Sequence, residues 1–354
     1  MVKRLNYIDN LRWMTVSLLI VYHAAIAYNT WDEANYIFFE PVKPIAAVVS
    51  FISPWFMPIM FLLAGVSARF SLQKRGYRTF IKERFVRLGI PFVFGLLAVN
   101  PIMSYVADVT HNGYSGGYFA HYTTYFTKFT DLTGYDGGFT LGHFWFLGVL
   151  IIISILSCVI IRLVGDTDVK GKKGFAVAAV LTVAAIALFN VDIMGKKVST
   201  YLCVYLLGYY FFSRQSFALS LKRCKIPLVM LALAANIANT AIFIFIGGHK
   251  DLNTICNYAS FALAVPALMI LAHDHLDFAN SFTRFNSSVS YVFYILHFPI
   301  VILCQYLLSH TGVGVIPNFT VTVFICYPLV YALCVGVRKV PYLQVLFGLS
   351  AKKK

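Results

Sequence analysis

An arginine and a histidine lie eleven residues apart in the first long apolar run of the sequence. The run reads RWMTVSLLIVYH from Arg12 to His23. On an α-helix, which rises about 1.5 Å per residue, His23 would lie roughly 16 Å beyond Arg12. The apolar core of a bilayer is about 30 Å thick, so we expect Arg12 at one surface and His23 near the middle. An ionisable side chain at that depth is costly and indicates a functional site.

Each of these two residues also has a simpler interpretation. Asp9 precedes Arg12 by three residues, so the two side chains can pair on one helical face. Arg12 could then be an ordinary anchor at the membrane surface. His23 could be a neutral histidine that is hydrogen-bonded between two helices.

A second histidine occurs at a similar expected depth near the end of the chain. The segment SSVSYVFYILHFPI carries Tyr291, Tyr294 and His297 at spacings of three residues, which places all three on one helical stripe. A polar stripe in a membrane helix should face protein or a water-filled cavity. Tyr294 or His297 could donate a hydrogen bond to an oxyanion there.

A basic run, KERFVRLGIPF, precedes the third apolar span. Arg84 and Arg87 are three residues apart, with Arg78 and Lys82 nearby. Paired guanidinium groups match phosphate oxygens bidentately. Gly89 and Pro91 follow and predict a bent or loosened start to the helix. The alternative is an ordinary basic cytoplasmic loop.

A fourth polar group lies in the segment LGHFWFLGVL, where His143 and Trp145 begin an apolar run. They are candidates for binding a substrate at the outer surface, and the alternative is a membrane-interface belt. The preceding stretch, about 107 to 141, is rich in Tyr, Gly and Thr and could bind sugars, because tyrosine has an apolar ring and a polar tip.

The composition indicates an integral membrane protein. Of 354 residues, 59% are hydrophobic and only 12% are charged, with a net charge of +15, whereas soluble domains have about 25% charged residues. The basic residues lie in short clusters between apolar runs, and no nucleic-acid motif occurs, so we expect no nucleic acid partner. The seven cysteines lie mostly in apolar runs and form no CxxC pair, so neither a disulfide framework nor a metal site is expected.

The chain is expected to fold as an all-α membrane protein with about ten transmembrane helices. If the N-terminus is cytoplasmic, 24 of the 29 Lys and Arg residues lie on the inner side, which predicts that both termini are cytoplasmic. Spans five and six could instead be a re-entrant pair. The predicted spans are 11–29, 44–66, 88–106, 142–163, 175–193, 198–213, 226–246, 254–272, 287–309 and 318–337.

Taken together, these motifs resemble the acyltransferase-3 family of membrane O-acyltransferases, and most closely its glucan biosynthesis protein C branch, which is succinyltransferase-like. The resemblance rests on YIDNLRWMTVSLLIVYH, ERFVRLGIPF, GHFWFL and SYVFYILHFPI, in order from residue 7 to about 300. It implies a single membrane acyltransferase domain over residues 1–354, without the soluble domain that some members carry. It also implies a multi-pass protein of the plasma (inner) membrane.

The resemblance implies a reaction as well. An acyl group other than an amino-acyl group, acetyl or succinyl, would pass from cytoplasmic acyl-CoA to a hydroxyl of an extracytoplasmic glycan, as in O-acetylation of the cell envelope. His23 carries over as the catalytic histidine and Arg12 as its partner in the motif, while Arg84 and Arg87 carry over as the pair that holds the CoA phosphates.

Two other classes of function remain open at this stage. A proton-coupled transporter or flippase of a lipid-linked saccharide would use the intramembrane histidines as a relay. A structural scaffold would leave those histidines without a role. Label from acyl-CoA appearing in a glycan would favour the enzyme, and translocation without label would favour the transporter.

Overall fold

The computed structural model describes residues 5–165, 191–193 and 195–349. These residues are mostly helical, and the described strands are the short antiparallel pair β1 (Asp192–Ile193) and β2 (Lys196–Lys197). The chain divides into two compact units that alternate along the sequence, and each is described by itself. The first unit comprises Met1–Arg12, Ser50–Phe85 and Val149–Thr283; the second comprises Trp13–Val49, Val86–Gly148 and Arg284–Lys354.

Seven of the described helical stretches are long and apolar enough to cross a membrane. They correspond to seven of the ten predicted spans, so the helical, multi-pass class is confirmed. The total of ten and the cytoplasmic position of the termini stay predictions. The seven stretches are Lys43–Leu72, Tyr77–Asn112, Gly142–Val164, Lys225–Ile246, Lys250–His275, Ser281–Ser309 and Val315–Lys339.

The other three predicted spans have different outcomes. Span 11–29 is interrupted at Leu18, where α1 (Asn6–Ser17) ends and α2 (Leu19–Ile26) begins. The carbonyl of Ser17 accepts the hydroxyl of Tyr327 at 2.8 Å, which satisfies a backbone group at the interruption. Span 198–213 is the shorter apolar helical stretch Val198–Phe212. Span 175–193 lies largely outside the described residues.

The first unit contains pairs of helices in close contact. In α12 (Lys225–Thr240) and α13 (Lys250–His275), which pack along each other, the buried residues Ala232, Ala264 and Ala267 form a small core. A Cβ atom added at Gly65 would lie 1.9 Å from the carbonyl oxygen of Tyr205. Small residues of this kind let membrane helices approach closely without a hydrophobic driving force.

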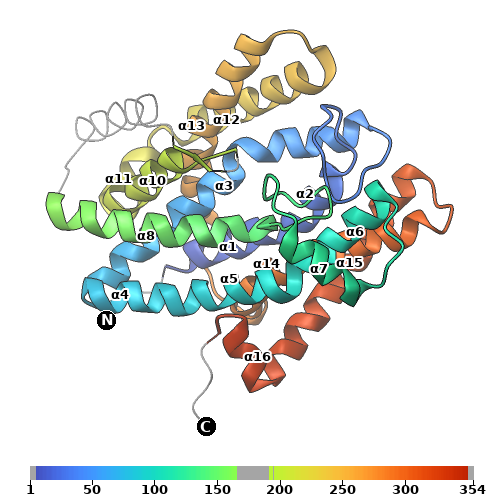
Figure 1. Cartoon of the computed structure of the whole chain (residues 1–354). Helices are drawn as coiled ribbons and strands as arrows, with labels where there is room; N and C mark the ends of the chain where they lie inside the picture. Colours follow the sequence, from blue (N-terminus) through green and yellow to red (C-terminus); the bar gives the residue numbers. More distant parts are fainter. Residues whose placement is uncertain (1–4, 166–190, 194, 350–354) are drawn as a thin grey trace. The chain divides into compact units, whose positions relative to one another are not determined.

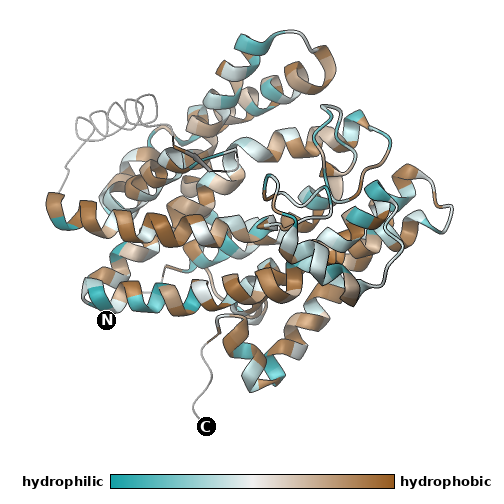
Figure 2. Cartoon of the chain, viewed as in Figure 1, coloured by the Kyte–Doolittle hydropathy of each residue, from teal (hydrophilic) through white to brown (hydrophobic). Residues whose placement is uncertain are grey.

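The remaining elements of the first unit include the basic helix α4 and the apolar helix α8, which ends in this unit. In Figure 2, α8 is hydrophobic along nearly its whole length, whereas α4 carries hydrophilic residues. The bounds are α3 Lys43–Leu72, α4 Tyr77–Arg84, α8 Trp145–Val164, α10 Val198–Leu207, the π-helix η4 Gly208–Phe212, α11 Gln215–Lys222 and the π-helix η5 Ala241–Ile246. Of these, α3 and α8 begin in the second unit.

The second unit holds the candidate site. It contains α2, a helical run from the π-helix η1 to α6, the short helix α7, and the C-terminal helices α14 to α16 (Figure 1). The bounds are η1 Phe85–Gly89, α5 Ile90–Phe94, the π-helix η2 Gly95–Val99, α6 Asn100–Asn112, α7 Tyr118–Thr127, the 3-10 helix η3 Gly142–Phe144, α14 Ser281–Ser309, α15 Val315–Lys339 and α16 Pro341–Leu346.

Polar bonds and a buried core fix α2 against α14 and α15. The side-chain amide of Gln305 donates to the carbonyl of Ala24 at 2.9 Å, and the hydroxyl of Tyr28 bonds to Asn318 Oδ1 at 3.1 Å. Tyr28, Phe298 and Ile302 belong to one buried apolar cluster. Since a buried polar group costs free energy unless it is paired, these bonds fix the relative register of the three helices.

Candidate functional site

Three histidines from distant parts of the sequence meet in the second unit. The ring centre of His297 lies 5.2 Å from that of His23 and 5.1 Å from that of His143. Phe298 stacks on His23, with ring centres 3.8 Å apart and planes 24° apart. Helices α2 and α14 and the 3-10 helix η3 each contribute one imidazole. The chain thus gathers three titratable groups among apolar neighbours.

His297 has a defined tautomer. Its Nδ1 lies 2.6 Å from the carbonyl oxygen of Tyr294. A carbonyl can only accept, so Nδ1 carries the hydrogen, and in the neutral ring Nε2 carries a lone pair. The side chain is fully buried, and Nε2 has no hydrogen-bond partner among the described residues. His297 therefore presents a basic nitrogen to the cluster.

His143 also has a defined tautomer, with the opposite nitrogen protonated. Its Nε2 lies 3.0 Å from the carbonyl oxygen of Ile295 and donates to it. Its Nδ1 is buried and has no hydrogen-bond partner within the described part of the chain. The side chain is only 5% exposed, so His143 lies inside the protein beside His297. Its role in substrate binding, and that of the half-buried Trp145, stay predictions.

Tyr294 holds the backbone of His143. Its hydroxyl donates to the carbonyl oxygen of His143. A tyrosine hydroxyl has one hydrogen to donate, so this donor is already in use. The geometry gives Tyr294 a positioning contact, and its predicted donation to an oxyanion would require this bond to break.

His23 is the member of the cluster that retains exposed surface. It is half-buried, whereas His143 and His297 are buried. Its ring makes an edge contact with Tyr22, with ring centres 5.3 Å apart. Of the three imidazoles, His23 is therefore the one whose side chain is not fully enclosed by the protein.

A pocket opens on the segment of α14 that precedes the histidine cluster. Its empty volume, open solvent included, is about 170 Å³. Phe293, which lines it, stacks on His297 with ring planes 6° apart. The other lining residues belong to α1, α14 and α15 and include several polar side chains, namely Trp13, Val16, Ser17, Asn286, Val289, Ser290 and Tyr331.

Arg12 lies in the first unit and is fixed there by two side chains. Its guanidinium donates to Asp9 Oδ1 at 3.1 Å, as the spacing predicted, and to Ser67 Oγ of α3 at 2.8 Å. Ser67 in turn donates to the carbonyl of Leu63. The arginine is thus held on α3, and its catalytic role stays a prediction.

The predicted phosphate-binding residues occupy a helix whose winding changes. Arg84, in the first unit, lies over the ring of Phe80 at 4.8 Å, while Arg78 and Lys82 are exposed. Arg87, in the second unit, is exposed on the π-helix η1. The loosened helix predicted from Gly89 and Pro91 is confirmed by this winding, and π-helical turns are frequent at functional sites.

Sequence reasoning missed what fixes the backbone at Arg87. Pro91 lacks the N–H that an α-helix would give to the carbonyl of Arg87, and this carbonyl accepts the hydroxyl of Tyr291 at 2.9 Å. Gly348 is packed against the same pair, since a Cβ added there would lie 2.6 Å from the Arg87 oxygen. From Tyr291, α14 continues roughly 9 Å to His297, so one helix contacts both Arg87 and the histidine cluster.

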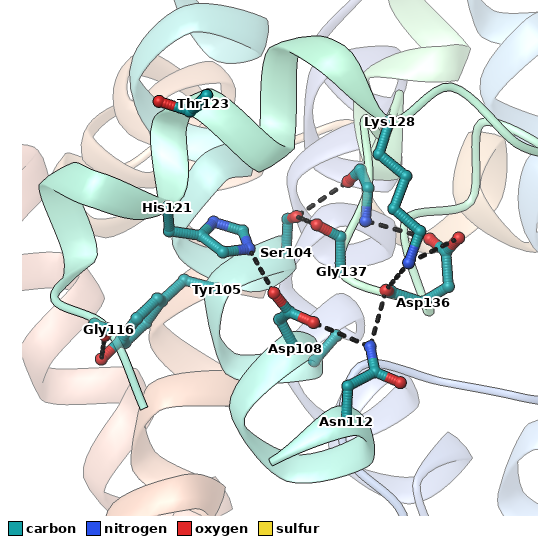
Figure 3. A network of polar contacts seen from close by, with 12 residues as sticks. Ser104, Tyr105, Asp108, Asn112, Gly116, His121, Thr123, Lys128, Asp136 and Gly137 are labelled. Atoms are coloured by element: carbon teal, nitrogen blue, oxygen red, sulfur yellow. Dashed lines mark hydrogen bonds and ion pairs between the residues drawn. The ribbon is translucent and has the colours of Figure 1, made fainter. Parts of the chain in front are cut away.

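A separate polar network, which no motif predicted, holds the stretch 107–141 (Figure 3). His121 Nε2 lies 3.2 Å from Asp108 Oδ2, and Asn112 donates to Asp108 Oδ1 at 2.7 Å. Ser104 donates to the carbonyls of Gly137 and Gly138. Burial lowers the pKa of His121, although Asp108 acts in the opposite direction. The spacing of Asp108 and His121 is not a known motif, so no sequence signal could have identified it.

Neither the histidine cluster nor this network resembles a metal site. No group of three or more His, Cys, Asp or Glu residues suited to a metal occurs in the part of the chain that the structure describes. The absence of a metal from the reaction stays a prediction.

Comparison with known proteins identifies a family. The family model described as an acyltransferase domain, of the acyltransferase-3 type, matches residues 5–338, which is nearly the whole chain. No curated protein and no solved structure matched the chain.

Proposed function

The chain belongs to this acyltransferase family, and we propose that it moves an acetyl or succinyl group from cytoplasmic acyl-CoA to a hydroxyl of an extracytoplasmic carbohydrate. The likeness of its motifs to the glucan biosynthesis protein C branch favours a glucan-type acceptor. The proposal places it in the plasma membrane with both termini cytoplasmic.

The observation that carries the proposal is the position of His23. It is the partly exposed imidazole of a cluster in which the two buried members each present a basic nitrogen. His23 would take the proton of the acceptor hydroxyl while the hydroxyl oxygen attacks the thioester carbonyl. The carbon–sulfur bond then breaks, and the CoA thiolate leaves and is protonated. General base catalysis of this kind contributes typically 10²–10⁴-fold.

His297 and His143 would support His23 rather than touch the acceptor. The ring of His297 lies between the other two, 5.1 to 5.2 Å from each. Its free Nε2 can share a proton taken up by the cluster. Such sharing stabilises an imidazolium in apolar surroundings, where an isolated charge would be costly.

The donor would bind through the basic residues around η1. Arg87 and Arg84, with Arg78 and Lys82, would contact the phosphates of acyl-CoA. Because Tyr291 links the backbone of Arg87 to α14, the acyl end could extend along this helix. A small, open pocket beside Phe293 and Ser290 lies along this segment.

The experiment that tests the function uses the purified full-length protein in liposomes. Acyl-labelled acetyl-CoA or succinyl-CoA is supplied on one side and an oligoglucan on the other. Transfer of label to the glycan is expected for the wild type and not for His23→Gln. If the glycan crosses the membrane without acquiring label, the protein is a transporter instead. Label retained on the wild-type protein after rapid denaturation at neutral pH, and missing from His23→Gln, would reveal an acyl-histidine intermediate.

A further inference from the structure

Four prolines within the helices of this protein leave carbonyl groups that side chains then bind. A proline has no N–H and cannot bond to the carbonyl four residues earlier. Because of Pro91, the carbonyl of Arg87 is available and accepts the hydroxyl of Tyr291. In the same way, the carbonyl of Leu97, four residues before Pro101, accepts the hydroxyl of Tyr122 at 3.4 Å. The carbonyl of Ser50, four residues before Pro54, accepts the amide of Asn239 at 3.3 Å. Membrane helices tolerate proline because neighbouring groups satisfy the released carbonyl in this way.

Pro299 of α14 releases the carbonyl that holds His143. It lies four residues after Ile295, whose carbonyl oxygen accepts Nε2–H of His143 at 3.0 Å. An ordinary residue at 299 would bring a backbone N–H to this oxygen. Pro299, which lies two residues after His297 in the same helix, therefore leaves the carbonyl oxygen of Ile295 available to the imidazole of His143.

We propose that Pro299 is a positioning residue that sets the tautomer of His143 and so makes its Nδ1 a proton acceptor beside His297. With Nε2–H committed to Ile295, the lone pair of the neutral ring is on Nδ1, which has no partner among the described residues. His143 is thereby assigned to proton transfer and not to contact with the acceptor sugar. The role of His143 in proton transfer rests on the proposed acyl transfer. The tautomer of its ring is independent of that proposal.

The tautomer can be measured directly. The full-length protein is labelled with ¹⁵N in its nine histidines, and the ring signals of His143 are identified by their loss in His143→Gln. In the wild type we expect a protonated Nε2 and an unprotonated Nδ1. In Pro299→Ala the new N–H competes for Ile295, and a mixture of tautomers is expected. A protonated Nδ1 in the wild type, or an unchanged tautomer in Pro299→Ala, would overturn the proposal. These results do not depend on whether acyl transfer occurs.

Turnover provides the second measurement. Losing a preference worth one hydrogen bond changes the ratio of the two tautomers roughly three- to tenfold. If the tautomers become about equally populated, the active fraction roughly halves, so kcat of Pro299→Ala should fall about twofold with KM for the acyl-CoA unchanged. Pro328→Ala is the matched control. Pro328 also lies within a helix, α15, and among the described residues no side chain donates to the carbonyl of Phe324, four residues earlier. An equal fall in kcat in Pro328→Ala would contradict a specific role for Pro299.

A second variant keeps the proposal testable if Pro299→Ala does not fold. The amide of His143→Gln can still donate to Ile295 but has no basic nitrogen. We expect this variant to retain its melting temperature and to lose at least tenfold in kcat. If it turns over normally, His143 serves only as a hydrogen-bond donor, and the assignment of Nδ1 is wrong.

Discussion

His297 and His23 lie with their ring centres 5.2 Å apart, although 274 positions separate them in the sequence. The contact joins a helix near the N-terminus to one near the C-terminus within a single unit. His297 is fully buried and has its Nδ1 fixed on the backbone of its own helix. The pair thus consists of a rigid inner imidazole and an outer one that retains exposed surface.

If this pair shares a proton during transfer, then replacing His297 by Gln should lower kcat by about tenfold or more, since Gln cannot take up the proton. KM for both substrates should change little. The comparison variant is His310→Gln, because His310 is exposed and bonds only to neighbours in its own turn. Equal kcat values for the two variants would show that His297 has no part in the proton transfer.

Arg87 is expected to contribute affinity for the acyl donor. Arg87→Ala should raise KM for acyl-CoA by roughly tenfold, the worth of one charge-assisted contact, while Arg87→Lys should recover part of the loss. The control is Arg75→Ala, which removes an arginine that pairs with Glu83 and is not among the proposed donor ligands. KM should be measured at two salt concentrations. Arg87 is not a donor ligand if KM and its salt dependence are unchanged.

The hydroxyl of Tyr291 is expected to matter for both stability and donor binding. Tyr291→Phe leaves the carbonyl of Arg87 without this donor, which should cost about 1 kcal/mol of stability and raise KM for acyl-CoA. Tyr342→Phe removes a hydroxyl from a ring that is 86% exposed and should change neither quantity. Thermal melting in detergent and donor titrations measure the two effects. A wild-type melting temperature for Tyr291→Phe would contradict the structural role of this bond.

The network around Asp108 and His121 should lose stability in acid. Because burial lowers the pKa of His121, the folded state binds its proton less readily than the unfolded state. Stability is therefore fully present above the ordinary pKa of 6.5 and falls as the pH drops below it. Limited proteolysis of the segment 113–141 between pH 7.5 and 5 should show increasing cleavage.

Two variants separate this effect from general acid sensitivity. His121→Asn removes the titrating group and should flatten the pH dependence of cleavage. His310→Gln, at an exposed histidine outside this network, should leave it as in the wild type. If cleavage of His121→Asn rises in acid as steeply as that of the wild type, another group is responsible.

The sequence predicted the helical class and most of the spans because apolar length is a local property. It also identified His23, His297 and His143, since a polar residue in an apolar run stands out. It placed His143 at an outer surface, because nothing local to LGHFWFL reveals that Tyr294 and Ile295 bind its backbone and ring.

The contacts of the prolines could not be predicted in the same way. The positions of Pro91 and Pro299 predict from the sequence alone which carbonyl groups lack a helical N–H. The side chains that donate to these carbonyls, Tyr291 and His143, lie more than 150 residues away in the sequence. Similarly, the interruption at Leu18 depends on Tyr327. These features arise from tertiary pairing, which a single sequence does not encode in any periodic pattern.

The most direct test of the account is the rate of acyl transfer by His23→Gln in liposomes, with the amount of folded protein in the membrane matched to the wild type. The account predicts that label from acyl-CoA reaches the glycan at least 10²-fold more slowly, while the variant binds acyl-CoA as the wild type does. Transfer at the wild-type rate would contradict the assignment of His23 as the base.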